Sequence, residues 1–285
     1  MPAASAGSVP DLLDSEQRGT RRMRWGDLPK RAVSAAVLAP LALICLWLGD
    51  GWWSGLLMAA TVGMAVEWVR LCGGRLASPA GAAVLLVILA TGLAALLGWA
   101  ASGLGVIAGG FLLAWLAGGR VSLAAGVPYL GLPLMALAWL RGDDAPGRDS
   151  VLFLLLVVWA SDIGAYAAGR LVGGPKLAPR VSPSKTWAGA AGGLAAGMAV
   201  GAAAALALDG GSAPRILAVA GGIAVVAQLG DLLESALKRH YGVKDSGRLI
   251  PGHGGLLDRL DGVLAAAPVA GLLAVMLGRG VVLWR

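Results

Sequence analysis

Charged residues are scarce in this chain. Of its 285 residues only 14% are charged, whereas 58% are hydrophobic, and the mean hydropathy is +0.77. Soluble domains usually carry about 25% charged residues, so the composition excludes a soluble globular protein. Long apolar runs satisfy their own backbone hydrogen bonds as helices, whereas spanning strands would show short alternating segments. We therefore expect an all-α, polytopic helical bundle in a membrane.

Cysteine and histidine are also rare, with two residues of each. Cys45 and Cys72 lie in or beside apolar runs, and their spacing fits neither a disulfide framework nor a metal-ligand motif. We interpret both as packing residues. Two histidines leave little room for a metal site built from imidazole groups, so the search for chemistry turns to carboxylates and basic side chains.

Nine apolar stretches are long enough to cross a bilayer, which takes roughly 20 residues. They lie near 32–49, 52–71, 80–99, 103–118, 122–140, 150–169, 187–208, 214–236 and 262–283. We expect these spans to form one transmembrane catalytic domain, residues 32–285, behind a polar basic arm at residues 1–31. The arm lacks the short cationic start and cleavage site of a secretory signal, so the first span is expected to stay as an anchor.

Basic residues are distributed unevenly between the two sets of loops. With the arm in the cytoplasm, the cytoplasmic loops contain Arg75, Arg120 and the cations of 170–185 and 238–259, whereas the opposite loops are poorer in cations. This asymmetry predicts a multi-pass protein of the inner (plasma) membrane whose two richest polar loops face the cytoplasm. A basic face also suits anionic lipid headgroups. The alternative is that these cations only fix the topology.

Inside the spans of the first half, Glu67 is the exception to a nearly complete lack of ionisable groups. It lies next to Trp68 and close to Arg70. We expect Glu67 to pair with a cation or to cap its span near the interface, in preference to a catalytic role.

The first candidate active-site loop covers about 161–189. Asp162 and Tyr166 lie one helical turn apart at the end of the sixth span, on one face. An aspartate there is either neutralised or part of a polar cavity, and an ion pair with Arg170 is the structural alternative. Prolines 175, 179 and 183 exclude a continuous helix in the segment that follows.

Ser182 and Pro183 have the pattern of an N-cap and a first-turn proline, which predicts that the seventh span opens there. Exposed N–H groups, a positive helix end and the side chains of 184–186 would make a phosphate cradle. The alternative is an ordinary capped helix with an interfacial lysine. The span then carries glycines at 189, 193, 197 and 201, which predict close helix packing within the subunit or across a dimer.

The second candidate active-site loop, about 231–262, has the densest mixed charge. Asp231, Glu234, Ser235 and Lys238 recur at helical spacing and so share a face. Asp258 and Asp261 also share a face if the ninth span begins there. Facing aspartates on two helix ends can hold Mg2+, which prefers oxygen ligands and bridges to substrate phosphates. A salt-bridged loop that only closes the bundle is the alternative.

Cations and glycines surround these carboxylates. The cations include Arg239, Lys244, Arg248 and Arg259, and the turn Gly252–Gly255 allows the backbone to approach a ligand closely. A metal and cations together can neutralise charge on a transferring phosphate. The pattern is therefore typical of a phosphoryl- or nucleotidyl-transfer site.

These residues resemble a known signature. Ser235-x-Leu237-Lys238-Arg239, Lys244-Asp245-x-Gly247 and Pro251-x-His253-Gly254-Gly255-Leu256-x-Asp258-Arg259-Leu260-Asp261 are similar to that of the phosphatidate cytidylyltransferase (CDP-diacylglycerol synthase) family. Asp162-x-x-Ala165-Tyr166, Gly169-Arg170, Ser182-Pro183-x-Lys185-Thr186, Glu67-Trp68 and Tyr129-x-Gly131-x-Pro133 also fit. The resemblance covers nearly all of the chain beyond the arm.

The resemblance implies the reaction CTP + phosphatidate → CDP-diacylglycerol + pyrophosphate, with Mg2+ required and a second cation left open. It implies a multi-span bundle, usually a homodimer, with CTP, phosphatidate and the bilayer as partners and no nucleic acid. The residues it marks as catalytic are Asp231, Asp258, Lys238, Arg239, Lys244 and His253. Its metal ligands are Asp231, Asp258 and Asp261. Its substrate-binding residues are Ser182, Lys185, Thr186, Asp162, Tyr166, Arg170, Ser235, Gly254, Gly255 and Arg259.

The chain departs from the family pattern at two positions. Ala188 stands where the family often has an acidic residue, so that role is absent or is supplied by Asp162 or Glu234. Gly262 stands where serine is common. Neither departure touches the paired aspartates, so we expect activity to survive.

Other functions remain open at this point. An ion-coupled transporter would also carry intramembrane carboxylates and broken helices, but here the ionisable groups cluster at one face and no inverted repeat is seen. The Asp-Gly-x-x-Ala-Arg motif of CDP-alcohol phosphotransferases does not occur. A CTP-dependent lipid kinase is closer in chemistry, and its product would be CDP instead of pyrophosphate.

Overall fold

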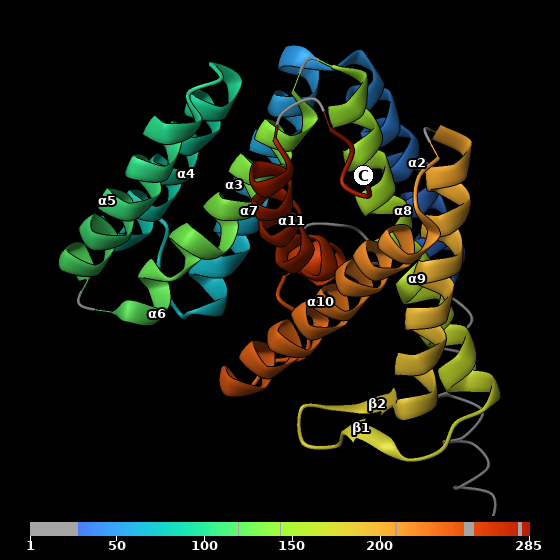
Figure 1. Cartoon of the computed structure of the whole chain (residues 1–285). Coiled ribbons are helices and arrows are strands. Elements are labelled where there is room, and N and C mark those ends of the chain that lie inside the picture. The colour runs from blue at the N-terminus through green and yellow to red at the C-terminus, as the bar shows by residue number, and fades with distance from the viewer. Residues whose placement is uncertain (1–27, 119, 143, 209, 248–253, 279–280) are drawn as a thin grey trace, which may run out of the picture.

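Helices make up almost every element of the chain (Figure 1). The computed structural model describes residues 28–285 except 119, 143, 209, 248–253 and 279–280, and except the side chains of 28–35 and 50. The first half contains α2 (Leu28–Leu48), α3 (Asp50–Leu71), α4 (Pro79–Leu96), α5 (Ala100–Gly118), α6 (Val121–Ala124) and α7 (Gly126–Arg141). The second half contains α8 (Ala145–Leu171), β1 (Lys176–Ala178), β2 (Ser182–Thr186), α9 (Trp187–Leu208), α10 (Ala213–His240) and α11 (Leu257–Leu277).

The all-α membrane architecture is confirmed. In the described part of the chain, 8 helices are long and apolar enough to cross a membrane, with α6 and α7 together forming one of them. The remaining predicted span corresponds to α2, whose segment Ala36–Leu48 is a shorter apolar helix by the same measure. The protein is therefore a multi-pass membrane protein, and the predicted count of nine is approximate.

Several predicted boundaries were wrong. The ninth span, expected at 262–283, is α11 and ends at Gly278, whose φ of 93° breaks the helix. The chain then folds back, so that Trp284 is buried against Phe153 with ring centroids 4.6 Å apart. The polar turn expected at 141–149 is shorter, because the Asp144 side chain accepts the Gly147 N–H and caps α8.

Two apolar cores hold the bundle together. One lies among α3, α4, α5, α6 and α7 and includes Leu257 and Leu264 of α11. The other joins α8, α9, α10 and α11 to α7, the start of α3 and the C-terminal tail. In Figure 1 α4 and α5 form one edge of the molecule and α9 lies toward the other, with α11 between them. The last helix therefore links the two halves.

The glycine ladder of α9 is used inside the subunit. All four glycines are buried. A Cβ at Gly193 would lie 2.8 Å from the Ser161 carbonyl oxygen of α8, and one at Gly201 would lie 2.7 Å from Ala220 of α10. The ladder thus brings α8, α9 and α10 close together, and it gives no support for a dimer.

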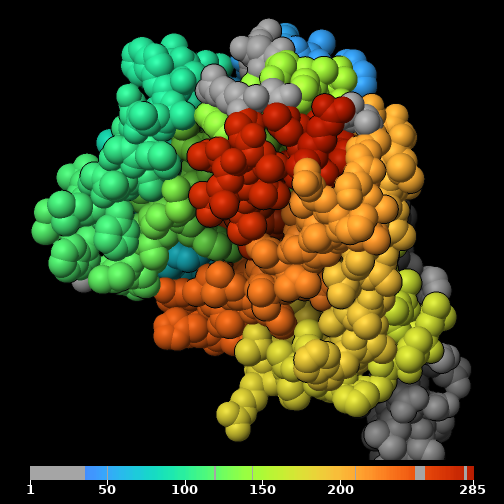
Figure 2. All heavy atoms as spheres, viewed as in Figure 1, coloured from blue at the N-terminus to red at the C-terminus, as the bar shows by residue number. Residues whose placement is uncertain are grey.

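The segment between α8 and α9 is a short antiparallel hairpin. Lys176 pairs with Thr186 and Ala178 with Ser182. The prolines do exclude a helix here, as predicted, but Ser182 and Pro183 do not open the next helix. They lie in β2, where a proline without an N–H is tolerated in a two-stranded sheet. The space-filling view shows this hairpin, in yellow, protruding at one end of the molecule (Figure 2).

Both cysteines are buried and free, as expected for packing residues. Cys72 lies just after α3, and burial raises the pKa of its thiol. A thiol that stays protonated is a poor nucleophile, which agrees with a structural role.

Candidate active site

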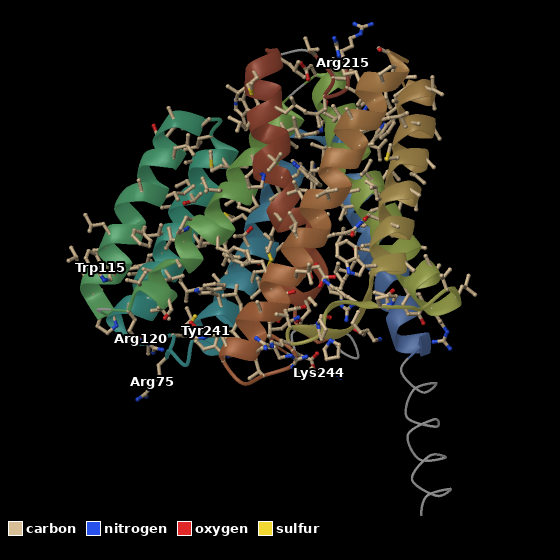
Figure 3. All side chains as sticks on the ribbon, turned by 60° about the horizontal axis from the view of Figure 1, so that its bottom comes forward. Arg75, Trp115, Arg120, Arg215, Tyr241 and Lys244 are labelled. Atoms are coloured by element: carbon tan, nitrogen blue, oxygen red, sulfur yellow. The ribbon has the colours of Figure 1, made fainter. Side chains whose placement is uncertain are left out.

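Ionic side chains gather at one end of the helix bundle. Figure 3 shows Arg75, Arg120 and Lys244 at this end together with Tyr241, whereas Arg215 lies at the opposite end. The C-terminal end of α10, the N-terminal end of α11 and the hairpin β1–β2 meet here (Figures 1 and 3). We call this the ionic end. It contains the carboxylates of both candidate active-site loops.

Lys185 of β2 forms an ion pair with Asp231 of α10. The distance between Lys185 Nζ and Asp231 Oδ2 is 2.6 Å, and the two side chains are 22% and 39% exposed. Two motifs that lie far apart in the sequence are thus joined in one contact. The two side chains are partly exposed, but the Lys185 ammonium nitrogen itself is buried, so Asp231 is the more accessible partner.

Lys238 joins α10 to α11. Its ammonium lies 2.7 Å from Asp258 Oδ1 and 3.3 Å from Glu234 Oε2. Glu234 is 2% exposed, so its charge depends on this contact, because an unpaired buried charge is costly. Lys238 is therefore shared between two carboxylates, and it keeps a partner if either one turns toward another cation.

Asp258 is held by backbone N–H groups as well. Its Oδ2 accepts from Gly255 N at 2.8 Å and from Ser246 N at 3.0 Å. Gly254 has φ 85°, a conformation that favours glycine. A Cβ on Gly255 would overlap the Ser246 hydroxyl. The glycines of the signature thus allow two backbone segments to close around one carboxylate.

Asp261 and Asp162 lie near the same centre. Asp261 interacts electrostatically with Asp231 and Glu234. Asp162 interacts in the same way with Asp231 and Lys185. Asp258 and Asp261 both lie in the first turns of α11, as the spacing predicted. Carboxylates of α8, α10 and α11 therefore converge at the ionic end.

This donor set fits a hard divalent cation. Among the described residues, no three acidic, histidine or cysteine side chains come close enough to form a complete metal cage. Mg2+ does not need one, because it usually binds one or two carboxylates, several waters and the phosphates of a substrate. The carboxylates near Asp231 outnumber the two lysines that contact them, and an added cation would relieve that excess of negative charge.

The ion pair between Asp162 and Arg170, which was the structural alternative, is not what Arg170 forms. Arg170 Nη1 donates to the Tyr166 hydroxyl at 3.3 Å, one turn away on α8, and both side chains are exposed. Asp162 lies instead near enough to Lys185 and Asp231 for their charges to act on it. Of the three candidates on α8, Asp162 therefore lies near Asp231 and Lys185, whereas Tyr166 and Arg170 form an exposed pair.

In β2 the two hydroxyl candidates are in different situations. Thr186 is 4% exposed, and its hydroxyl accepts the Gly189 N–H at 3.0 Å. Thr186 therefore caps α9, which is the role the sequence had suggested for Ser182. Ser182 is buried within the strand. The direct phosphate contacts expected of both remain predictions.

The remaining signature residues lie around the loop after α10. Arg239 donates to the carbonyl oxygens of Val181 and Val243, at 3.4 and 3.2 Å, and thereby ties α10 to the hairpin. Lys244 and Arg259 are exposed, and Ser235 is partly buried on α10. His253 and Arg248 lie outside the described residues, so their predicted roles have no structural counterpart here.

Two residues of this end were not predicted as part of the site. Glu67 accepts the N–H groups of Leu256 and Leu257 and so caps α11, not its own helix. Gln228 lies one turn before Asp231 and donates to the Ser161 hydroxyl and the Ala190 carbonyl, both at 3.2 Å. Glu67 could have been recognised from the sequence, because a single acidic residue in an apolar span needs a partner. The sequence held no comparable signal for Gln228.

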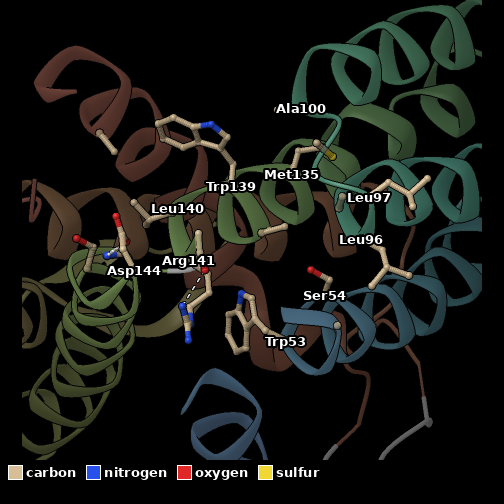
Figure 4. Close-up of a pocket in the computed structure, with 18 of the residues that line it drawn as sticks. Trp53, Ser54, Leu96, Leu97, Ala100, Met135, Trp139, Leu140, Arg141 and Asp144 are labelled. Atoms are coloured by element: carbon tan, nitrogen blue, oxygen red, sulfur yellow. Dashed lines mark hydrogen bonds between the residues drawn. The ribbon is translucent and has the colours of Figure 1, made fainter. Parts of the chain in front are cut away.

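A cavity of about 690 Å3 lies elsewhere, at the opposite ends of these helices (Figure 4). Trp53, Met135, Trp139 and Arg141 line it, together with Ala274 and Gly278 at the end of α11. Arg141 Nε donates to the Leu46 carbonyl at 2.8 Å. The cavity contains none of the converging carboxylates, so its size does not make it the candidate active site.

Comparison with known proteins supports the signature. The family model described as "Cytidylyltransferase family" matches residues 29–277. A phosphatidate cytidylyltransferase of Brucella suis is 40% identical over 251 residues, which cover 85% of this chain and 91% of that protein. That of Pseudomonas aeruginosa is 38% identical over 273 residues, 89% and 99% of the two chains. That of Mycobacterium leprae is 44% identical over 162 residues, 56% and 50%. The match to the family model covers far more than half of the chain, and the chain belongs to the cytidylyltransferase family.

Proposed function

We propose that this protein is a phosphatidate cytidylyltransferase, which converts CTP and phosphatidate to CDP-diacylglycerol and pyrophosphate. The observation that carries the proposal is the pairing of Asp231 with Lys185 and of Asp258 with Lys238 at one end of a membrane bundle. Relatives that carry this name are similar over most of both chains. A membrane enzyme with a lipid substrate needs its charged chemistry at the membrane surface, and the ionic end provides it.

The chemistry requires little proton transfer. A phosphate oxygen of phosphatidate attacks the α-phosphorus of CTP, a new P–O bond forms, and the bond to the β-phosphate oxygen breaks. The attacking phosphate is already anionic at neutral pH, so no strong general base is needed. The obstacle is repulsion between two polyanions, and positioning with electrostatic stabilisation accounts for most of the rate.

The basic residues have separate tasks in this proposal. Lys185 contacts Asp231 through a buried ammonium nitrogen, and in this proposal it exchanges that partner for a phosphate of CTP when the substrate binds. Lys238 is more buried and holds Asp258. Arg239, Lys244 and Arg259, with His253 of the signature, bind the lipid phosphate and the leaving pyrophosphate. Tyr166, Arg170, Ser235 and the Gly254–Gly255 backbone complete the substrate contacts.

Mg2+ is the proposed cofactor, with Asp231, Asp258 and Asp261 as the residues that hold it. When bound, the ion neutralises phosphate charge and orients the α-phosphate. Lys238 can remain paired with Glu234 at 3.3 Å when Asp258 engages the cation. Asp162 or Glu234 supplies the acidic group that Ala188 does not.

The ionic end faces the cytoplasm of the inner membrane in this proposal. The cation-rich loops containing Arg75, Arg120 and Lys244 share that end (Figure 3), as the positive-inside rule requires. CTP is available on that side. A homodimer is retained from the family resemblance alone, because the glycine ladder is occupied within the subunit.

The test uses purified protein in lipid nanodiscs with phosphatidate, Mg2+ and CTP labelled at the α-phosphate. We expect label in a lipid product, release of pyrophosphate, and loss of both in Asp258→Ala, which should remain folded. Release of CDP with unlabelled phospholipid would indicate a lipid kinase. Wild-type turnover in Asp258→Ala would remove the metal assignment, and no labelled lipid from folded wild-type protein would refute the function.

A further inference from the structure

Glu67 is a buried carboxylate that the proposed mechanism does not use. It lies on α3 and is 2% exposed. Its Oε1 accepts the N–H of Leu256 at 3.0 Å, and its Oε2 accepts the N–H of Leu257 at 2.9 Å. Both donors are at the start of α11, which has no side-chain cap of its own because Leu256 stands at the N-cap position. Glu67 therefore supplies the missing cap from another helix.

The same carboxylate also lies against the loop that precedes α11. A Cβ on Gly247 would overlap Glu67 Oε1, and a Cβ on Gly255 would lie 2.8 Å from Oε2. Residues 248–253 run between these two glycines. Glu67 thus touches the described chain on both sides of that segment and leaves room only for glycine.

The N–H groups at this turn are divided between two acids. Those of Ser246 and Gly255 go to Asp258, and those of Leu256 and Leu257 go to Glu67. Without Glu67, these two N–H groups would lose their acceptors, and we expect them to compete for the Asp258 carboxylate, which already accepts two N–H groups of this turn. Asp258 would then turn away from the contacts that it now makes with Lys238.

Trp68, the neighbour of Glu67 in the sequence, fixes this part of α3 against α6 and α7. Trp68 Nε1 donates to the Leu123 carbonyl at 3.1 Å, and the Trp68 ring packs on Tyr129 with centroids 5.1 Å apart. Gly126 lies so close to Trp68 that a Cβ there would overlap the indole. Glu67 is therefore presented from a rigid part of the molecule, as a positioning group must be.

We infer that Glu67 is a positioning residue for nucleotidyl transfer, which acts by orienting Asp258 and the turn that carries it. The prediction for kcat and KM rests on the proposed function. The effect of Glu67 on Asp258 is measured separately, as Mn2+ binding without substrates. Groups that orient a metal ligand typically change metal affinity or activity by about 10–100-fold when they are removed.

The experiment compares Glu67→Ala and Glu67→Gln with Thr61→Val, a matched control. Thr61 is also buried on α3, but its hydroxyl donates to Leu57 within the same helix. Each variant is measured for kcat, KM for CTP, melting temperature, and binding of Mn2+ followed by its paramagnetic resonance signal without substrates. Glu67→Gln keeps one acceptor oxygen, so it covers the case in which Glu67→Ala does not fold.

We expect Glu67→Ala to weaken Mn2+ binding and to lower kcat by about 10–100-fold, Glu67→Gln to lie between it and wild type, and Thr61→Val to bind and turn over like wild type. In the double variant with Asp258→Ala, loss of Glu67 should add no further loss of Mn2+ binding, because both changes act through one group.

A lower melting temperature with unchanged kcat and Mn2+ affinity would show a purely structural cap and overturn the inference. Additive losses in the double variant would also overturn it. If wild-type protein bound Mn2+ but made no CDP-lipid, the proposed function would fail, whereas the binding comparison would still decide the role of Glu67.

Discussion

The two ends of the helix bundle use aspartate and basic side chains in different ways. At the ionic end, Asp231 pairs with a lysine of β2 and Asp258 with a lysine of α10, and the Asp231 side chain remains partly exposed. At the other end, Asp144 caps its own helix and Arg141 donates to backbone carbonyls beside a cavity (Figure 4). The end of α11 that carries Asp258 and the end near Gly278 are about 30 Å apart along a 21-residue helix. Charge alone therefore does not mark the site; convergence of charge from several elements does.

The largest expected difference in turnover is between two variants that each lose one aspartate, Asp231 at the ionic end and Asp144 at the opposite end. Asp231→Ala should lower turnover by about 10³-fold or more, because the group acts on charge in the transition state. Asp144→Ala should leave turnover unchanged and cost about 1 kcal/mol of stability through loss of a helix cap. Labelled-CTP assays and thermal unfolding in nanodiscs check both. Equal losses of turnover in the two variants would contradict the functional difference between the ends.

A smaller effect on turnover is expected when one cation is removed at a time. One cation is Lys185, which pairs with Asp231 of α10, and the other is Arg215, at the opposite end of α10. Lys185→Met should reduce turnover by about 10–100-fold, since Asp231 then loses the ammonium that orients it. Arg215 is exposed at the far end of α10, and Arg215→Met should have no effect on turnover. The measurement is kcat at saturating CTP and phosphatidate. A normal kcat in Lys185→Met would show that this ion pair is only structural.

Arg141 tests whether a buried cation at the end opposite the ionic end contributes to stability alone. It is 7% exposed and donates to Leu46 of α2 and to Gly142. Arg141→Met would leave these carbonyls without that donor, so we expect a loss of about 1–3 kcal/mol in the free energy of unfolding. Turnover per folded molecule should be unchanged. A large fall in kcat with unaltered unfolding would place Arg141 in the catalytic machinery after all.

The smallest effect is expected at Gln228, which links α8, α9 and α10 below the ionic end. Interhelical hydrogen bonds in membranes contribute about 0.6 kcal/mol each on average, and Gln228 makes two across helices. Gln228→Leu should therefore cost about 1 kcal/mol of stability, read from unfolding midpoints. A change of several kcal/mol would mean that the packing of all three helices depends on this residue.

Much of the fold followed from composition, and the grouping of several candidate residues followed from motif spacing. Apolar runs predicted the helices because each run must satisfy its own backbone in a membrane. The spacing of Asp258 and Asp261 correctly predicted a shared position on α11. Helix ends were less predictable: Ser182-Pro183 has the pattern of a cap, but pairing with Lys176–Ala178 places it in a strand. That pairing depends on a contact with a second strand, which local propensity does not record.

The contacts made by single polar residues were the least predictable part. Glu67 was expected to be structural, and capping is what it does, but its partner is α11. No local pattern near Glu67 specifies Leu256 or Leu257. The same holds for the contact between Lys185 and Asp231, whose two motifs were recognised separately.

The cap on α11 has a consequence for biosynthesis. Leu256 lies 189 residues after Glu67, and ribosomes add about 5–20 residues per second, so roughly 10–40 s pass between synthesis of the acceptor and of its donors. During that interval α3 is already made, while the turn that it completes does not yet exist. The nascent chain therefore lacks the capped turn beside Asp258 until α11 has been made.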